Sequence, residues 1–212
     1  MLIRKSILLG WFLFAFSLLH PVLGQTKKMY PINEVSKDSS LLIFVEKLKQ
    51  AIVKKDKAFI VGALDENAGS SFDGGNGILH FQRYWLDKET EPSFWFYLER
   101  AIKVGGTFGK ENLYFVFPYV YELKPDIEDD DFPFAVVTGE KVNIRAQPNL
   151  KAPIIKQLTY EMVRYVHSDE DTTYGKNPIG DPEWIKIQTW DKKIIGWVYY
   201  KYLYSPIDCR LF

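Results

Sequence analysis

The stretch that decides the fold of this chain begins with Val142-Asn143-Ile144-Arg145 and Pro148, and it closes with Gly196-Trp197-Val198 and Tyr202-Leu203. Around these residues the chain consists of short runs rich in β-branched and aromatic residues, separated by Gly, Pro, Asn and Asp, which is the pattern of short strands. The predicted strands cover residues 135–138, 142–145, 154–158, 162–167, 184–189 and 194–199. Short strands at this spacing predict a small β-barrel.

The last predicted hairpin has an aliphatic face and an aromatic face. If the loop around Asp191-Lys192 holds an even number of residues, one face carries an aliphatic set that we expect in the core: Ile185, Ile187, Ile194, Gly196 and Val198. The other face then carries three rings and a cation, in the set Trp184, Lys186, Gln188, Ile195, Trp197 and Tyr199. Rings beside a cation can stack on a peptide or a sugar. An odd loop length would exchange the two faces.

These segments resemble the bacterial SH3-like domain (SH3b). The likeness is carried by residues 142–148, 154–158, 183–187, 196–198 and 202–203, and it spans nearly all of residues 134–204. The resemblance implies a small barrel that binds rather than catalyses. Some relatives bind peptidoglycan or its cross-bridge peptides beside a separate hydrolase domain, and others are general interaction modules of the cell envelope. This chain departs from the first group because it has no recognisable hydrolase domain.

We therefore expect the aromatic face of the barrel to bind a cell-wall peptide or glycan, or an envelope protein. The predicted binding residues are Trp184, Lys186, Trp197 and Tyr199, with Trp190 and Tyr174 near the rim. Two alternatives stay open: the rings cover the barrel without binding a ligand, or they pack against residues 78–102 of the preceding domain. The loop from Ser168 to Pro182 is a long insertion that either shapes the site or is mobile.

Residues 25–124 predict a mostly helical domain that we assign to no family. Apolar residues at helical spacing, together with capping residues, predict four helices that begin near Ser39 or Ser40, Asp56, Ile78 and Pro92. The fourth ends at Gly105-Gly106, and residues 113–121 predict one or two strands. The expected fold class is α+β, a mostly helical N-terminal domain followed by a small SH3-like β-barrel.

The first residues are typical of a secretory signal peptide. Arg4 and Lys5 precede an apolar run over residues 7–19, and Gly24 supplies a small residue before a polar stretch. The alternative is an uncleaved membrane anchor, but the run is shorter than the ~20 residues that span a bilayer. We expect residues 1–24 to be removed, which leaves a periplasmic or secreted protein with no membrane span.

An acidic segment separates the two expected domains. Five acids stand among the seven residues from Pro125 to Asp131, so residues 125–133 are expected to be a solvated acidic linker. The whole chain carries 27 basic and 27 acidic residues, which does not fit a nucleic-acid-binding protein.

The chain has a single cysteine, Cys209, which lies in the expected tail over residues 205–212. One cysteine can form neither an internal disulfide nor a cysteine-based metal cluster.

The sequence offers little for catalysis. The best constellation is Asp73 in a glycine-rich loop, His80 in the following helix, and a carboxylate such as Glu99. The glycines match neither a dinucleotide fingerprint nor a P-loop, and no metal-binding or cofactor motif is present. We therefore expect a non-enzymatic binding protein without metal or cofactor. The alternative is an envelope-associated hydrolase with a site near Asp73 and His80.

Overall fold

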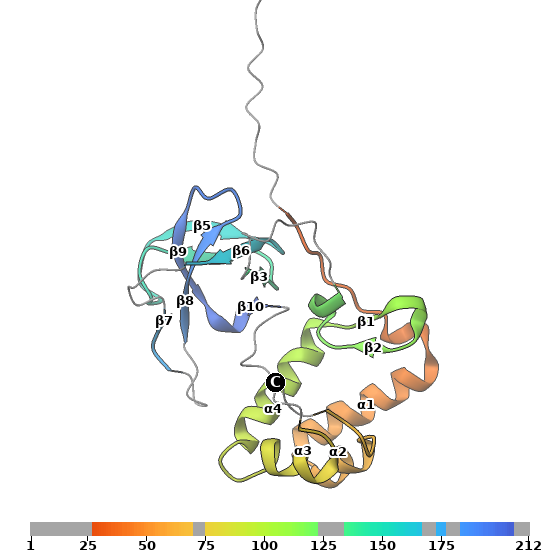
Figure 1. The fold of residues 1–212 in the computed structure, drawn as a ribbon. Coiled ribbons are helices and arrows are strands. Elements are labelled where there is room, and N and C mark those ends of the chain that lie inside the picture. Colours follow the sequence, from red (N-terminus) through yellow and green to blue (C-terminus); the bar gives the residue numbers. More distant parts are fainter. Residues whose placement is uncertain (1–26, 70–74, 123–133, 167–172, 177–182, 206–212) are drawn as a thin grey trace, which may run out of the picture.

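The computed structural model describes residues 27–69, 75–122, 134–166, 173–176 and 183–205. Among these residues, four α-helices form the first part, and a curled antiparallel sheet forms the second (Figure 1). The predicted α+β class and its order, helices first and barrel second, are confirmed.

The first two helices begin at aspartate caps. Helix α1 (Ser39–Lys54) starts after Asp38, whose carboxylate accepts a hydrogen bond from the Leu41 N–H at 2.8 Å. The predicted cap at Ser39 or Ser40 was wrong by one or two residues, because a carboxylate at 38 already satisfies the exposed N–H groups. Helix α2 (Lys57–Ala63) starts after Asp56, as predicted.

Two further helices complete the helical part. Helix α3 spans Ile78–Trp85, and α4 spans Glu91–Val104 with a proline in its first turn. Helix α4 ends at Gly105, whose φ of 103° suits glycine alone, so the predicted end is confirmed. The helices pack on a core that comprises Val35, Val45, Leu48, Ile52, Ile60, Leu86, Phe94, Trp95 and Ile102.

A small β element links the helices to the barrel. Strands β1 (Thr107–Phe108) and β2 (Phe115–Val116) pair antiparallel, and short 3₁₀ helices lie at Val35–Lys37 (η1), Lys110–Asn112 (η2) and Tyr119–Glu122 (η3). The prediction of strand over 113–121 therefore holds only for β2. Pro118, which has no N–H to donate, ends that strand before η3.

The barrel has the strand order β10-β3-β6-β8-β9-β4-β5, with β7 paired to β8. Its strands are β3 (Phe134–Val137), β4 (Val142–Arg145), β5 (Ile154–Leu158), β6 (Met162–Tyr165), β7 (Thr173–Tyr174), β8 (Trp184–Thr189), β9 (Ile195–Tyr199) and β10 (Leu203–Tyr204), with the 3₁₀ helix η5 at Tyr200–Tyr202. All six predicted strands are present, although β6 ends earlier than predicted. The two-residue strands β7 and β10 were not predicted, since they are too short to show an alternating pattern.

The register of the β8–β9 hairpin confirms the predicted faces. Ile185 lies opposite Val198 and Ile187 opposite Gly196, which leaves the loop 190–193 with an even number of residues. The even loop length places Ile185, Ile187 and Val198 in the barrel core. That core also holds Ala135, Val137, Val142, Ile144, Leu158, Val163, Tyr200 and Leu203.

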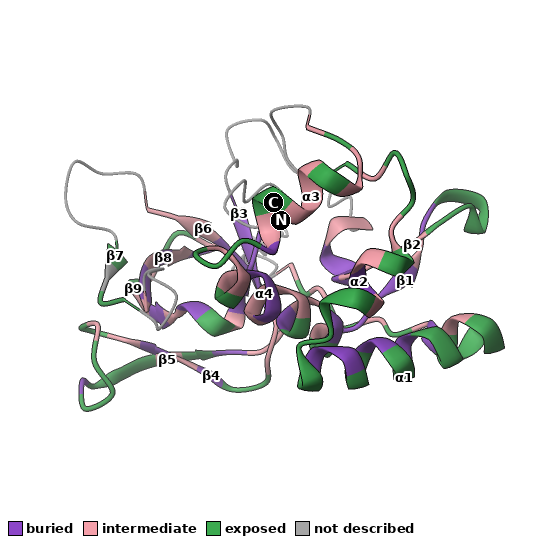
Figure 2. Ribbon diagram, turned by 90° about the horizontal axis from the view of Figure 1, so that it is seen from below, coloured by how far each residue is buried: buried purple, intermediate pink, exposed green. Residues whose placement is uncertain are grey.

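The helical part and the barrel share a third core cluster. Residues 27–29 run along the barrel, where Met29 N–H donates to the Tyr160 carbonyl at 2.6 Å, although they were predicted to belong to the helical domain. Tyr119 from η3 donates its hydroxyl to the Met29 carbonyl at 2.8 Å. This cluster comprises Tyr119, Val120, Phe134, Val136, Met162 and Tyr204. Figure 2 shows α4 between the barrel and the remaining helices.

Several predicted segments lie outside the described residues: the signal peptide at 1–24, the acidic linker at 125–133, most of the loop from 168 to 182, and the tail from 206 with Cys209. Part of that long loop is described, and there Thr173–Tyr174 is strand β7 rather than irregular loop. In the described ranges, no helix has the length and apolar character needed to cross a membrane.

Candidate functional site

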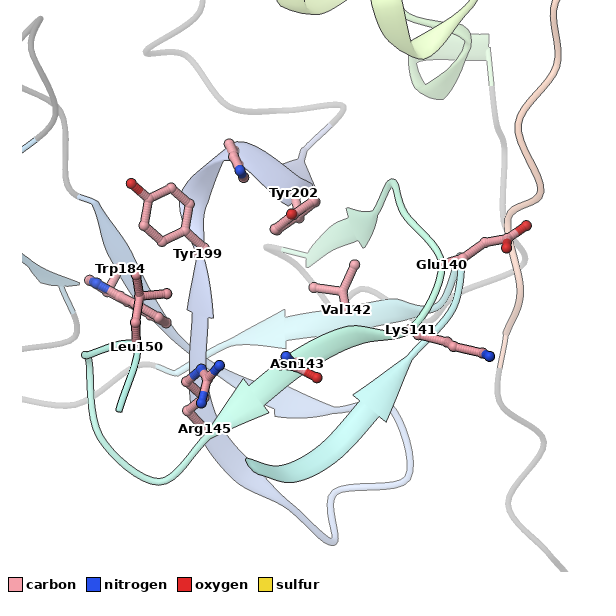
Figure 3. Close-up of a pocket in the computed structure, with 10 residues that line it drawn as sticks. Glu140, Lys141, Val142, Asn143, Arg145, Leu150, Trp184, Tyr199 and Tyr202 are labelled. Carbon is pink, nitrogen blue, oxygen red and sulfur yellow. The ribbon is translucent and has the colours of Figure 1, made fainter. Parts of the chain in front are cut away.

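A hollow of about 280 Å³ opens at the end of the β8–β9 hairpin that lies opposite its loop (Figure 3). It is lined by Glu140, Lys141, Val142, Asn143, Arg145, Leu150, Trp184, Tyr199, Lys201 and Tyr202. The lining comes from β4 with the turn before it, the loop after β4, the start of β8, and the segment from the end of β9 through η5. The site is thus built from stretches of the barrel that are far apart in the chain.

Two of the lining rings, those of Trp184 and Tyr199, lie against each other. Trp184 and Tyr199 lie opposite each other in the β8–β9 ladder, and their ring centres are 5.1 Å apart at an angle of 86°. The Tyr199 hydroxyl donates to a Glu183 carboxylate oxygen at 2.5 Å. This bond to an anion, together with burial, raises the pKa of Tyr199 above its usual value. Tyr199 is therefore a neutral, oriented ring at neutral pH.

Trp184 differs from its predicted state. The sequence predicts an exposed indole, whereas the residue is only 4% exposed. Its ring packs at a right angle against that of Tyr199, and β7 pairs with β8 directly at Trp184. Trp184 consequently supports the hollow and presents only a small part of its ring to a ligand.

Two cations lie beside these rings. The Lys201 ammonium is 5.3 Å from the ring centre of Tyr199 and 5.0 Å from that of Tyr202. Arg145 donates from Nη1 to the Ala152 carbonyl at 2.7 Å, and this bond fixes the loop after β4. Figure 3 shows Arg145 on the same side of the hollow as Trp184. The combination can hold an anionic group beside an apolar or sugar ring.

The hollow also contains charges that lie farther from the rings. Glu140 and Lys141 stand just before β4, and Figure 3 shows both side chains pointing away from Trp184 and Tyr199. Asn143 accepts a hydrogen bond from the Gln157 side-chain amide at 2.9 Å. Basic residues outnumber acidic ones in the lining as a whole, so it favours an anionic ligand.

Lys186 and Trp197 share the aromatic face with Trp184 and Tyr199 but do not line the hollow. They lie opposite each other in the hairpin, with the Lys186 ammonium 6.0 Å from the Trp197 ring centre. Tyr174 is paired through its backbone with Trp184 and thus lies next to the site in the sheet. The predicted strip therefore extends along the hairpin, and the hollow occupies only one end of it.

Trp190 lies in a different environment from the other predicted residues. The Trp190 ring packs on the core cluster shared by the helical part and the barrel, and its centre lies 6.5 Å from that of Phe134. The Arg164 guanidinium lies 3.9 Å from the centre of the Trp190 ring. Trp184 is the first residue of β8, whereas Trp190 follows the last one. At about 3.3 Å per strand residue, the two indoles are attached at opposite ends of the strand. Trp190 is therefore not at the rim of the hollow, contrary to the prediction.

Eight residues of the hollow were not predicted to belong to the site: Glu140, Lys141, Val142, Asn143, Arg145, Leu150, Lys201 and Tyr202. Arg145 and Tyr202 stand inside the segments that carry the family likeness, where the sequence indicated only strand and closing residues. The proximity of Arg145 to Trp184 depends on β4 pairing with β9, where Arg145 lies opposite Trp197. This pairing joins residues about fifty positions apart, which alternation along one hairpin does not reveal.

The alternative site in the helical part is not assembled by the described residues. Asp73 lies outside them. His80 stacks on Tyr84, with ring centres 6.2 Å apart and an angle of 15°, and Glu99 is exposed on α4. Within the described ranges, no group of three or more His, Cys, Asp or Glu side chains could hold a metal ion.

The packing alternative concerns residues 78–102. None of them lines the hollow. Arg100 of α4 contacts the barrel elsewhere: its guanidinium carbon lies 4.6 Å from the Tyr200 ring centre and 4.1 Å from that of Tyr204. Helix α4 thus meets a neighbouring face of the barrel and does not line the hollow.

Comparison with known proteins supports the barrel assignment. Residues 140–204 match the family model of the bacterial SH3 domain. No curated protein and no solved structure matches the chain. The matched range contains every residue that lines the hollow. The C-terminal part of the chain therefore carries a bacterial SH3 domain.

Proposed function

We propose that this chain is an exported, non-enzymatic binding protein whose SH3 domain recognises a component of the cell envelope, peptidoglycan or a peptide. The observation that carries the proposal is the hollow in which Trp184, Tyr199 and Tyr202 meet Arg145 and Lys201. Bacterial SH3 domains often bind cell-wall material, and the basic, then apolar, first residues of the chain support export.

The chemistry of the hollow fits such a ligand. Aromatic rings stack on the apolar faces of sugars and peptides, while arginine and lysine bind carboxylates. Peptidoglycan combines both kinds of group, because its glycan carries peptides with free carboxylates. A contribution from Arg145 and Lys201 would make binding weaker at high salt, since the cations lie near solvent.

A matched pair of lysine variants tests the site. Lys201 and Lys193 are both exposed, but Lys201 lines the hollow and Lys193 lies in the hairpin loop at the other end of β9. In a co-sedimentation assay with purified peptidoglycan, we expect Lys201→Met to weaken binding about tenfold, as loss of a charged contact does. Lys193→Met should bind as the wild type does.

Two results would count against the proposal. Failure of the wild-type chain to sediment with peptidoglycan at low salt would refute recognition of the cell wall. Equal binding by wild type, Lys201→Met and Tyr199→Ala, all shown to be folded, would remove the hollow as the site. Release of soluble fragments from the peptidoglycan during incubation would instead indicate an enzyme.

A further inference from the structure

Arg100 is a buried cation where α4 meets the SH3 domain. The residue is 8% exposed. Its Nη2 group donates hydrogen bonds to the backbone carbonyl oxygens of Tyr200, at 3.2 Å, and of Leu203. Its guanidinium also contacts the rings of Tyr200 and Tyr204. One side chain from the helical part therefore holds the backbone and two rings of the last described segment of the barrel.

That segment has two sides. Tyr199, Lys201 and Tyr202 line the hollow. Tyr200 and Leu203 alternate with these residues in the sequence, and their side chains are buried in the barrel core. Arg100 binds the backbone carbonyl groups of Tyr200 and Leu203. Residues 199–203 thus present side chains to the ligand site while their backbone is fastened to α4.

The barrel itself also bonds this segment. Tyr200 N–H donates to the Glu183 carbonyl at 2.9 Å, and Thr138 N–H donates to the Tyr202 carbonyl at 2.8 Å. The 3₁₀ turn of η5 has poorer hydrogen-bond geometry than an α-helix. Hydrogen bonds from a charged donor are stronger than those between neutral groups, so the bonds from Arg100 stabilise the position of η5.

Arg100 is not fully satisfied by these contacts. Its Nε and Nη1 atoms are buried without a hydrogen-bond partner among the described residues. A buried charge of this kind is a costly way to join two domains, because apolar residues of similar size often do so equally well. The arginine is better explained by what it positions than by stability alone.

We propose that Arg100 is a positioning residue for the ligand site, through which the helical domain pre-organises Tyr199, Lys201 and Tyr202. The inference rests on the proposed function of the hollow. Pre-organisation improves affinity because the free protein has less conformational freedom to lose on binding. It also gives the helical domain a role in binding without direct contact with the ligand.

The test compares Arg100→Met with Lys103→Met in the full chain. Both lie on α4, but Lys103 is exposed. The probe is a mixture of soluble fragments released from purified peptidoglycan by a muramidase, and affinity is measured by calorimetry. We expect Arg100→Met to bind about tenfold more weakly, the factor for loss of a bond to a charged group, with Lys103→Met unchanged. Equal affinity of folded Arg100→Met and wild type overturns the inference.

Hydrogen exchange separates this inference from the proposed function. In Arg100→Met, amides of residues 199–204 should exchange faster, while those of Ile154–Leu158 keep their protection. If the wild type binds no fragments, the proposed function fails, and hydrogen exchange alone then tests whether Arg100 positions residues 199–204. Unchanged protection of these residues in Arg100→Met overturns the inference. If Arg100→Met does not fold, Arg100→Lys replaces it, since lysine keeps the charge but loses the planar fork.

Discussion

Truncation of Trp184 should damage the barrel before it reports on ligand binding. The residue is 4% exposed and packs edge-on against Tyr199. Replacement of a buried tryptophan by alanine costs about 3–5 kcal/mol, because apolar contacts are lost and a cavity remains. Folded proteins are stable by only about 5–15 kcal/mol, so Trp184→Ala should lose a large fraction of its stability.

Urea unfolding followed by far-UV circular dichroism measures this loss. With a slope of about 2 kcal/mol per molar urea, the midpoint should fall by roughly 2 M. Trp197→Ala is the matched control, since it removes a partly buried indole from the same face and should cost about 1–2 kcal/mol. Equal midpoint shifts for the two variants would refute the assignment of Trp184 as a supporting residue. Trp184→Phe, which keeps a ring, is the better variant for binding assays.

Two further predictions concern glycine packing and pH. A Cβ on Gly196 would lie 2.7 Å from Ile144 Cγ2 and 2.9 Å from the Arg145 carbonyl oxygen, so Gly196→Ala should destabilise the barrel by about 1–3 kcal/mol in thermal unfolding. Gly62→Ala, with open space around it in α2, should stabilise by about 0.5–1 kcal/mol, and a shared direction of change would contradict this reasoning. Bonds from Lys37, Phe108 and Thr107 lower the pKa of Glu34 to about 2. The ionised Glu34 carboxylate stabilises the folded protein above the pKa of the unfolded chain, and this stability is lost as the pH falls towards 2. Glu34→Gln should therefore be less stable than wild type at pH 7, and the difference in unfolding free energy should shrink as the pH approaches 2. A difference that does not change with pH would contradict this prediction.

Local rules made much of the fold predictable. Asp56 starts α2 because its carboxylate meets the free N–H groups of the first turn, and Gly105 ends α4 because the chain needs a positive φ there. Alternation along β8 and β9 identified Ile185, Ile187 and Val198 as core, because successive side chains of a strand point to opposite faces.

Sequence patterns were enough to predict the order of helices and strands, the core of the last hairpin and the family likeness, since each depends on residues close together in the chain or on a recognisable motif. Packing between distant elements establishes which rings meet: Trp184 packs against Tyr199, Trp190 packs against Phe134, and Arg145 lines the hollow. The contact of Arg100 with Tyr200 likewise joins residues 100 positions apart. Such contacts arise from the packing of distant elements, and no local pattern of side chains encodes them.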